Sequence, residues 1–133
     1  MDIEAIVHYG KEYAQNSPLK FKHCALIVKG EGSARRIVAK GHNSYIMDLL
    51  NHNHSIHSEV AVLEDFINNN TSPRLPRHKR IAQAKAYMKK NSYDMVVIRI
   101  GQNNYNKTRN SMPCTKCQKH LKEWSFRQIY YTT

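Results

Sequence analysis

The sequence predicts one α/β domain in which helices cover a central mixed sheet of about four to five strands. Two observations lead to this class. The length of 133 residues suits one compact domain with a real core. Helical and β-rich patterns alternate in the order α-β-β-α-α-β-α-β, without an internal repeat or a low-complexity linker. We therefore expect a single domain over residues 1–133, built in two or three layers.

The first half of the chain predicts a helix, a hairpin and a second helix. Apolar residues recur at helical spacing over residues 2–15, which indicates an amphipathic helix. The runs 21–29 and 35–43 are rich in β-formers and are joined by GEGSA, a sequence typical of a hairpin with a glycine-containing loop. A helix after Ser58 then ends in the asparagine-rich turn 68–73.

The second half predicts two further helices and two strands. A basic segment around 77–90 reads as helix, and the apolar, β-branched run 93–100 suits a buried strand. Residues 101–112 are polar and predict a loop. A helix over 114–124 and a last strand over 127–133 complete the order.

Composition narrows the setting of the protein. Nothing in the sequence resembles a signal peptide, and the longest apolar runs, such as MVVIRI (95–100), are far too short to cross a bilayer. Three cysteines cannot form a fully paired disulfide framework, and two of them form a C-x-x-C, which suggests metal or redox chemistry in a reducing compartment. We expect a soluble, intracellular protein, cytoplasmic or nuclear, without a membrane partner.

Positive charge is concentrated in the second half. The chain carries a formal charge of +11, yet residues 1–65 hold seven Lys/Arg against eight Asp/Glu, whereas residues 66–133 hold fourteen against two. Seven of the basic residues lie within 74–90. Such asymmetry favours a polyanionic partner, although a solvated basic face gives the same composition.

The segment PCTKC (113–117) carries metal chemistry. Pro113 is favoured in the first turn of a helix, and Cys114 and Cys117, three residues apart, then share one face of that helix. A helix N-terminus lowers the pKa of a thiol, so both sulfurs suit zinc as thiolates. Two cysteines fill half of a tetrahedral site.

A histidine at another helix start offers a third ligand. With His57 the set becomes His-Cys-Cys with one open position, the layout of a catalytic zinc with bound water. A redox or structural C-x-x-C, or a four-ligand zinc site completed by another histidine, remains open. Read alone, His57 and Glu59 also fit two solvated residues at the start of a helix. We place His52 and His54 on a loop surface.

These motifs resemble those of the cytidine and deoxycytidylate deaminase superfamily of zinc hydrolases. The quoted sequence follows the pattern H-x-E…P-C-x-x-C, with HSE at 57–59 and PCTKC at 113–117. CALIVKG (24–30) and IVAKGHN (37–43) look like the opening hairpin of that family, and RQIYYTT (127–133) like the strand that follows its second motif. The resemblance implies a cytidine-deaminase-like fold with a zinc site at two helix N-termini.

The resemblance also assigns residue roles. It implies that His57, Cys114 and Cys117 bind Zn²⁺, and that Glu59 shuttles protons without coordinating the metal. Asn43 matches the asparagine that holds the base or sugar in many members. Ser58 stands where many members have alanine, and we expect little consequence.

One departure from the family bears on the substrate. The 53 residues of the segment 60–112, between the two motifs, form a longer gap than in compact members, and the basic helix lies within it. We expect four of its cations to contact phosphates: Arg77, Lys79, Arg80 and Lys85. The chain stops soon after the second motif, so the substrate pocket is either open or completed by a second copy in a homo-oligomer.

The sequence thus predicts a zinc-dependent enzyme that hydrolyses the exocyclic amine of cytosine to give uracil. The +12 half favours a cytidine or deoxycytidine unit within single-stranded DNA or RNA as substrate. Two enzymatic alternatives are deamination of free dCMP or CMP and deamination of adenosine in tRNA. The third alternative is a non-catalytic, zinc-stabilised module that binds nucleic acid.

Overall fold

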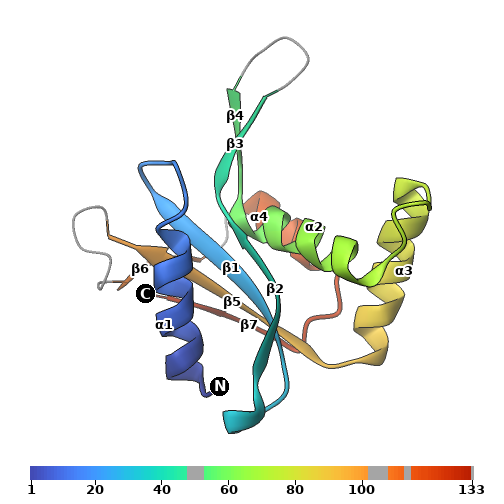
Figure 1. Ribbon diagram of the computed structural model, residues 1–133, viewed down its shortest axis with the longest axis horizontal. Helices are drawn as coiled ribbons and strands as arrows, with labels where there is room; N and C mark the ends of the chain where they lie inside the picture. Colours follow the sequence, from blue (N-terminus) through green and yellow to red (C-terminus); the bar gives the residue numbers. More distant parts are fainter. Residues whose placement is uncertain (48–52, 102–107, 113–114, 133) are drawn as a thin grey trace.

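A computed structural model shows an α/β fold in three layers. It describes four stretches of the chain: residues 1–47, 53–101, 108–112 and 115–132. Within them a mainly antiparallel, five-stranded sheet lies between one helix on one face and three on the other (Figure 1). These helices are α1 (Ile3–Ala14), α2 (Ser58–Asn70), α3 (Arg77–Lys90) and α4 (Thr115–Leu121). The predicted α/β class is confirmed.

The sheet is mixed because one of its pairings is parallel. Its strands are β1 (Lys22–Lys29), β2 (Arg36–His42), β5 (Tyr93–Ile100), β6 (Thr108–Arg109) and β7 (Gln128–Tyr131). The central strand β1 pairs with β2 and β5, both antiparallel. On its other side β5 pairs with β6 at one end, antiparallel, and with β7 along the rest, parallel. The crossover from β5 to β7 carries α4.

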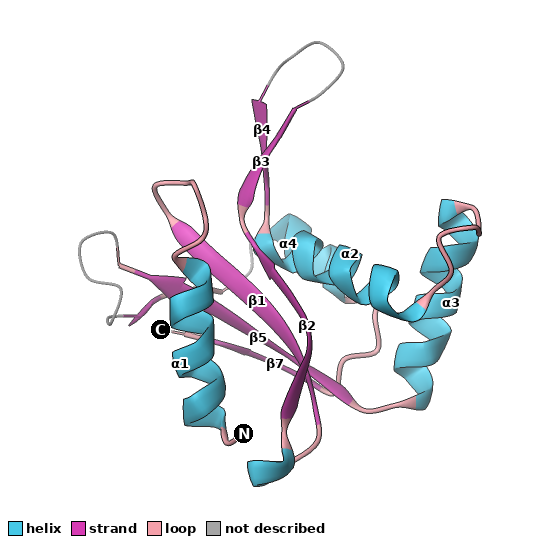
Figure 2. Ribbon diagram, viewed as in Figure 1, coloured by secondary structure: helices cyan, strands magenta, loops and turns pink. Residues whose placement is uncertain are grey.

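Two strand assignments differ from the sequence expectation. A separate antiparallel hairpin, β3 (Ser44–Met47) with β4 (Asn53–Ile56), projects from the sheet (Figure 2). The sequence predicts a loop at His54, whereas this residue lies in β4. His52, for which we also expect a loop, lies outside the described residues. Similarly, β6 falls inside the predicted loop 101–112. The strands β4 and β6 are short and largely polar in sequence, so pairing partners decide their conformation rather than apolar alternation.

The other element boundaries agree closely with the predictions. Both α3, over 77–90, and β5, over 93–100, have the predicted bounds. In contrast, α4 ends at Leu121, three residues before the predicted end, and Trp124 follows in the connection to β7. None of the helices in the described stretches is both long and apolar enough to span a bilayer.

Side chains of the central strands alternate between two cores. On the α1 face, β1 and β5 contribute residues such as Cys24, Leu26 and Ile98, which pack against Ile6 and Ala14. On the opposite face, residues such as Ala25, Ile27, Met95 and Val97 pack against α2, α3 and α4. This alternation decides which strand residues can reach the start of α2.

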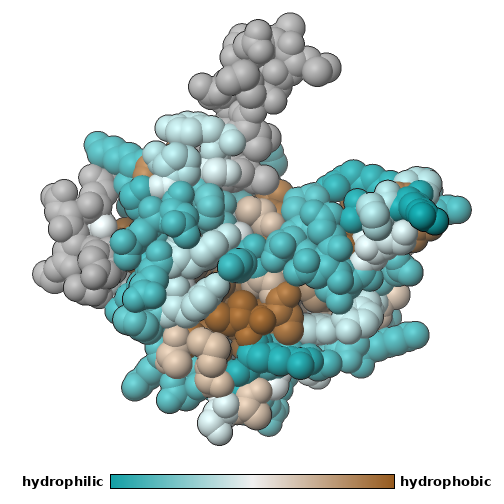
Figure 3. Space-filling view, viewed as in Figure 1, coloured by the Kyte–Doolittle hydropathy of each residue, from teal (hydrophilic) through white to brown (hydrophobic). Residues whose placement is uncertain are grey.

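Helix α2 lies very close to the edge strand β2. A Cβ atom on Gly41 would collide with the backbone of Ala61 and Val62, so only glycine permits this approach. Beside it, between α1 and α2, a hollow of about 480 Å³ is lined in part by Ile37, Val38 and Ala39. Figure 3 shows hydrophobic surface in this region between the helices.

Candidate metal centre

Three potential metal ligands converge where α2 and α4 begin. His57 is the N-cap of α2, Glu59 lies in its first turn, and Cys117 lies in the first turn of α4. Their ligand atoms all lie within 4.8 Å of one another, and the Nδ1 of His57 is 3.1 Å from the Sγ of Cys117. His57 is exposed, whereas Glu59 and Cys117 are buried. These three residues could hold a metal ion.

The donor set fits zinc. Imidazole nitrogen, thiolate sulfur and carboxylate oxygen are the three ligand types that zinc uses in proteins. Two donors bonded to one zinc at about 2.0–2.3 Å lie less than about 4.6 Å apart, a limit that the His57–Cys117 separation meets. The predicted third protein ligand, Cys114, and the preceding Pro113 lie outside the described residues.

The carboxylate of Glu59 is held in place by its neighbour. Ser58 is buried, and its hydroxyl donates a hydrogen bond of 2.6 Å to Oε1 of Glu59. From the sequence we expect little consequence of Ser58, because its side chain is neither a metal ligand nor an acid. The structure instead makes it the partner that orients the carboxylate.

The sheet presents two more polar side chains near this group. His23 and Arg99 are paired across β1 and β5, on the face that packs against α2. Burial, followed by the charge of Arg99 and then of His57, lowers the pKa of His23, while Glu59 acts in the opposite direction. His23 thus lies within electrostatic reach of both the arginine and the candidate metal ligands. Sequence reasoning missed both residues, because each stands in a run that reads as ordinary strand.

Asn43, the predicted substrate contact, holds the end of β2 to β1. Its Oδ1 accepts a hydrogen bond from the backbone N–H of His23 at 2.9 Å, and its Nδ2 donates to the carbonyl of Phe21 at 2.6 Å. Both polar atoms of this largely buried side chain therefore have backbone partners. A contact with a ligand would have to share or replace one of these bonds.

The basic helix α3 lies against the far end of α2. Arg77 pairs with Glu64, and Arg80 donates hydrogen bonds to Asn68 and Thr71. The thirteen residues of α2 span about 20 Å at about 1.5 Å per residue, so the contacts of Arg80 lie well away from His57. Glu64, the partner of Arg77, stands near the middle of α2.

The remaining two cations of the predicted phosphate contacts differ from each other. Lys85 is 3.4 Å from Glu123 and lies over the ring of Trp124, whereas Lys79 is exposed. Three of the four predicted phosphate contacts thus already have partners within the chain. Their contact with nucleic acid stays a prediction.

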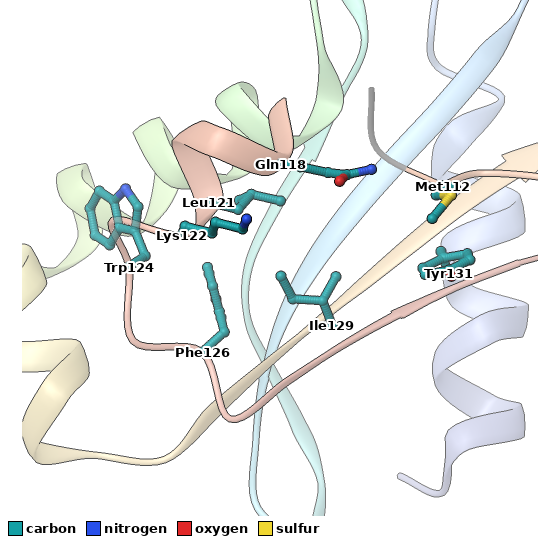
Figure 4. A pocket seen from close by; sticks show the side chains of 8 residues that line it. All are labelled: Met112, Gln118, Leu121, Lys122, Trp124, Phe126, Ile129 and Tyr131. Atoms are coloured by element: carbon teal, nitrogen blue, oxygen red, sulfur yellow. The ribbon is translucent and has the colours of Figure 1, made fainter. Parts of the chain in front are cut away.

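An apolar cavity lies on the other side of α4, above the sheet. It measures about 400 Å³, and Figure 4 shows side chains from α4, from β7 and from the segment between them that surround it. Its lining consists of Met112, Gln118, Leu121, Lys122, Trp124, Phe126, Ile129 and Tyr131. None of the three candidate metal ligands is among these residues, so the cavity is separate from the candidate metal centre.

No model of a known protein family matches this chain, and neither a curated protein nor a solved structure matches it. The resemblance to the deaminase superfamily therefore rests on the sequence motifs themselves. The convergence of His57, Glu59 and Cys117 is a separate, geometric observation.

Proposed function

We propose that the protein is a zinc-dependent hydrolytic deaminase that converts cytosine to uracil in a pyrimidine nucleotide or nucleic-acid unit. One observation carries the proposal. His57 and Cys117, sixty residues apart in the sequence, meet at two helix starts with the buried carboxylate of Glu59 beside them. Such a combination of soft and nitrogen ligands with an adjacent acid–base group suits hydrolysis.

His57 and Cys117, together with Cys114, would hold the zinc ion. When bound, zinc acts as a Lewis acid that lowers the pKa of a water molecule toward neutrality. Glu59 takes a proton from the attacking water and passes it to the ring nitrogen of cytosine, and a further proton goes to the departing ammonia. The hydrogen bond from Ser58 fixes Oε1 and so orients the carboxylate for this transfer.

Glu59 could act in one of two ways, as a proton shuttle or as a metal ligand. Its carboxylate lies close enough to the other ligands to bind a metal, whereas the resemblance implies that it only moves protons. In the shuttle role, Glu59→Gln abolishes turnover and leaves the metal content unchanged. Equal loss of metal and activity would instead make Glu59 a ligand.

The decisive assay offers the metal-loaded protein cytidine, dCMP, single-stranded DNA and single-stranded RNA, and follows products by mass. We expect one of these to show the mass change for replacement of an amino group by oxygen. Glu64→Gln, a neutral substitution farther along α2, is the matched control and should keep wild-type turnover. Absence of product from every substrate would contradict the proposal, and zinc and polymer binding without turnover would indicate the non-catalytic module. A tRNA is added as a separate substrate, and inosine formed in it would indicate the adenosine deaminase.

A free nucleotide is the second candidate substrate, and the state of α3 favours it. Three of its cations have partners within the chain, and one of them, Arg80, binds residues at the end of α2 opposite the candidate metal centre. A polymer that follows α3 would need to displace these partners.

A salt titration separates the two substrates. If the polymer binds along α3, replacing Arg77, Lys79, Arg80 and Lys85 by glutamine flattens the slope of log affinity against log salt by up to about three units, at about 0.7 per phosphate contact. An unchanged slope with a single-stranded oligonucleotide, together with turnover of dCMP, would assign the enzyme to free nucleotides.

A further inference from the structure

Two arginines face each other at the end of the sheet that lies nearest the candidate metal centre. Arg99 on β5 and Arg109 on β6 are directly paired in the antiparallel register. Residues opposite each other in such a pair project from the same face, with Cβ atoms about 4.5–5.5 Å apart. Arg99 follows Met95 and Val97 in the alternation of β5, so both arginines lie on the α2 face.

Neither guanidinium has an ion-pair partner among the residues that the structure describes. The Nε of Arg99 is buried and finds no hydrogen-bond acceptor there. Its guanidinium instead lies over the ring of Phe21, with the central carbon 4.9 Å from the ring centroid. Like charges opposite each other in a sheet are destabilising, and a buried donor without an acceptor adds to that cost.

The backbone holds the two arginines in this arrangement. Oγ1 of Thr132 donates a hydrogen bond of 2.7 Å to the carbonyl of Arg109 and accepts one of 3.2 Å from the N–H of Arg99. The buried hydroxyl of Ser111 bonds to Thr132 and to the carbonyl of Val97. These hydrogen bonds hold the backbone of both arginines in place, although the two positively charged side chains repel each other.

The charge of Arg99 extends toward the candidate metal centre. Its neighbour His23 is within electrostatic reach of Arg99 on one side and of Glu59 and His57 on the other. A ligand at the metal centre could consequently place a negative group against the arginines.

We propose that Arg99 and Arg109 form a binding site for the phosphate group of a small ligand. A phosphate monoester carries about two negative charges near neutral pH, which matches two guanidinium groups. Each guanidinium can bind two phosphate oxygens in its planar fork, and such binding gives Nε of Arg99 the acceptor that it lacks. That this phosphate belongs to a pyrimidine nucleotide rests on the proposed function.

Phosphorus NMR and thermal unfolding with inorganic phosphate test the site without any need for turnover. We expect the wild-type protein to bind phosphate and to unfold at a higher temperature in its presence. Arg99→Gln combined with Arg109→Gln should weaken phosphate binding about tenfold or more, because bonds to charged groups are lost. Arg99→Lys keeps the charge but lacks the planar fork and should give an intermediate loss.

The matched control is Lys89→Gln combined with Lys90→Gln. It removes the same net charge from exposed positions at the end of α3 and should leave phosphate binding nearly unchanged. Equal losses in the two double variants would overturn the proposal, because the effect would then be general charge. Phosphate bound at a metal would persist in the arginine variant, so the difference between variants reports the arginines alone.

Competition identifies the source of the phosphate. We expect dCMP to displace inorganic phosphate and deoxycytidine not to do so. Stronger displacement by a single-stranded oligonucleotide without terminal phosphates would overturn the assignment to a small ligand. Phosphate binding is measured apart from activity, so the two proposals can fail separately. An inactive protein that binds phosphate at the arginines would refute the proposed function and support this site. An active protein that does not bind phosphate there would refute this site and support the proposed function.

Discussion

The two faces of the strands β1 and β5 differ at one end of the sheet. On the α1 face the residues are apolar from Val28 to Cys24 on β1 and from Val96 to Ile100 on β5. The polar residues at the two ends of this face are bonded within the chain, since Lys22 donates to the carbonyl of Ser17 and the buried Asp94 pairs with Arg127. On the α2 face the same strands change from Ala25 and Val97 to His23 and Arg99. His23 and Arg99 therefore place partly buried polar side chains on the α2 face, at the end where α2 begins.

The difference follows from how the helices lie on the sheet. Helix α1 packs along β1 and β5 with its apolar face and contributes only to a core. In contrast, α2 and α4 both begin at the end that carries His23 and Arg99, so His57, Glu59 and Cys117 meet there. The α1 face of the sheet thus forms a hydrophobic core, whereas the α2 face also carries the candidate metal centre. Substitutions on the α1 face should affect stability alone, and substitutions near the start of α2 should also affect metal binding or turnover.

The largest separation is expected between the two described cysteines, one on each face. Cys117→Ala removes a candidate metal ligand and should lower zinc affinity more than about 100-fold. Loss of a group that only hydrogen-bonds to a ligand already lowers metal affinity about 10–100-fold, and loss of the ligand itself should cost more. Cys24→Ala should leave zinc affinity unchanged, because Cys24 is buried against α1. Titration against a chromophoric chelator measures both, and equal affinities would remove Cys117 from the site.

A pair of glycines sharpens the comparison next. Gly41→Ala forces a methyl group against the backbone of α2 and should cost about 1–3 kcal/mol of stability while also weakening metal binding, because the start of α2 must move. The methyl of Gly10→Ala meets side chains on the α1 face, chiefly the flexible end of Ile98. Denaturant unfolding and metal titration should show a loss of stability alone for Gly10→Ala.

Two buried serines provide a smaller effect. Ser58→Ala removes the hydrogen bond to Glu59 and should slow the proposed deamination by about fivefold, in line with about 1 kcal/mol for one hydrogen bond, with zinc retained. Ser17→Ala removes only a local bond to the backbone of Leu19 and should not alter turnover. Similar rates for wild type and Ser58→Ala would show that the carboxylate is positioned by other groups.

The last effect is expected only at alkaline pH, on the α1 face, and is small near pH 9. Burial raises the pKa of Cys24 from 9.0 to about 12. The folded protein keeps this proton where the unfolded chain loses it, so stability falls as pH rises from about 9 toward 12, by at most about 1.4 kcal/mol per pH unit.

The variant Cys24→Ala tests this slope. It should flatten the fall in unfolding free energy between pH 9 and 10, before the tyrosines whose pKa burial also raises, Tyr13 and Tyr93, contribute strongly. An unchanged slope between wild type and variant would assign the pH dependence to other groups.

Local patterns predicted most of the fold. The apolar, β-branched run of β5 and the turn-forming residues on either side of α3 predicted the bounds of these two elements, because such signals depend on neighbouring residues alone. The hairpin of β3 and β4 was missed because its second strand, NHSI, lacks β-branched alternation and is held by its partner strand. The order of strands and the parallel β7 depend on contacts distant in the sequence.

The candidate site was predictable in part. His57 and Cys117 stand in motifs with recognisable spacing, and the structure brings them together with Glu59. The sequence did not predict a role at the site for Ser58, His23 or Arg99. Only the fold reveals that these residues lie close to Glu59 and the other candidate metal ligands. The charge of 74–90 suggested a phosphate groove, but the sequence could not reveal that Arg77 pairs with Glu64.

The two edges of the sheet bear on self-association. An exposed strand edge invites pairing with another chain, and proteins limit this with charge, shortness or bulges. Here the edge strand β2 carries Arg36 and Lys40, its register against β1 shifts at Ile27, and the opposite edge is divided between the short strands β6 and β7. At about 0.1 M salt the Debye length is about 10 Å, so electrostatic repulsion between these basic molecules weakens as ionic strength rises. At high salt, protection against aggregation then depends on the shortness of β6 and β7 and on the irregular register of β2.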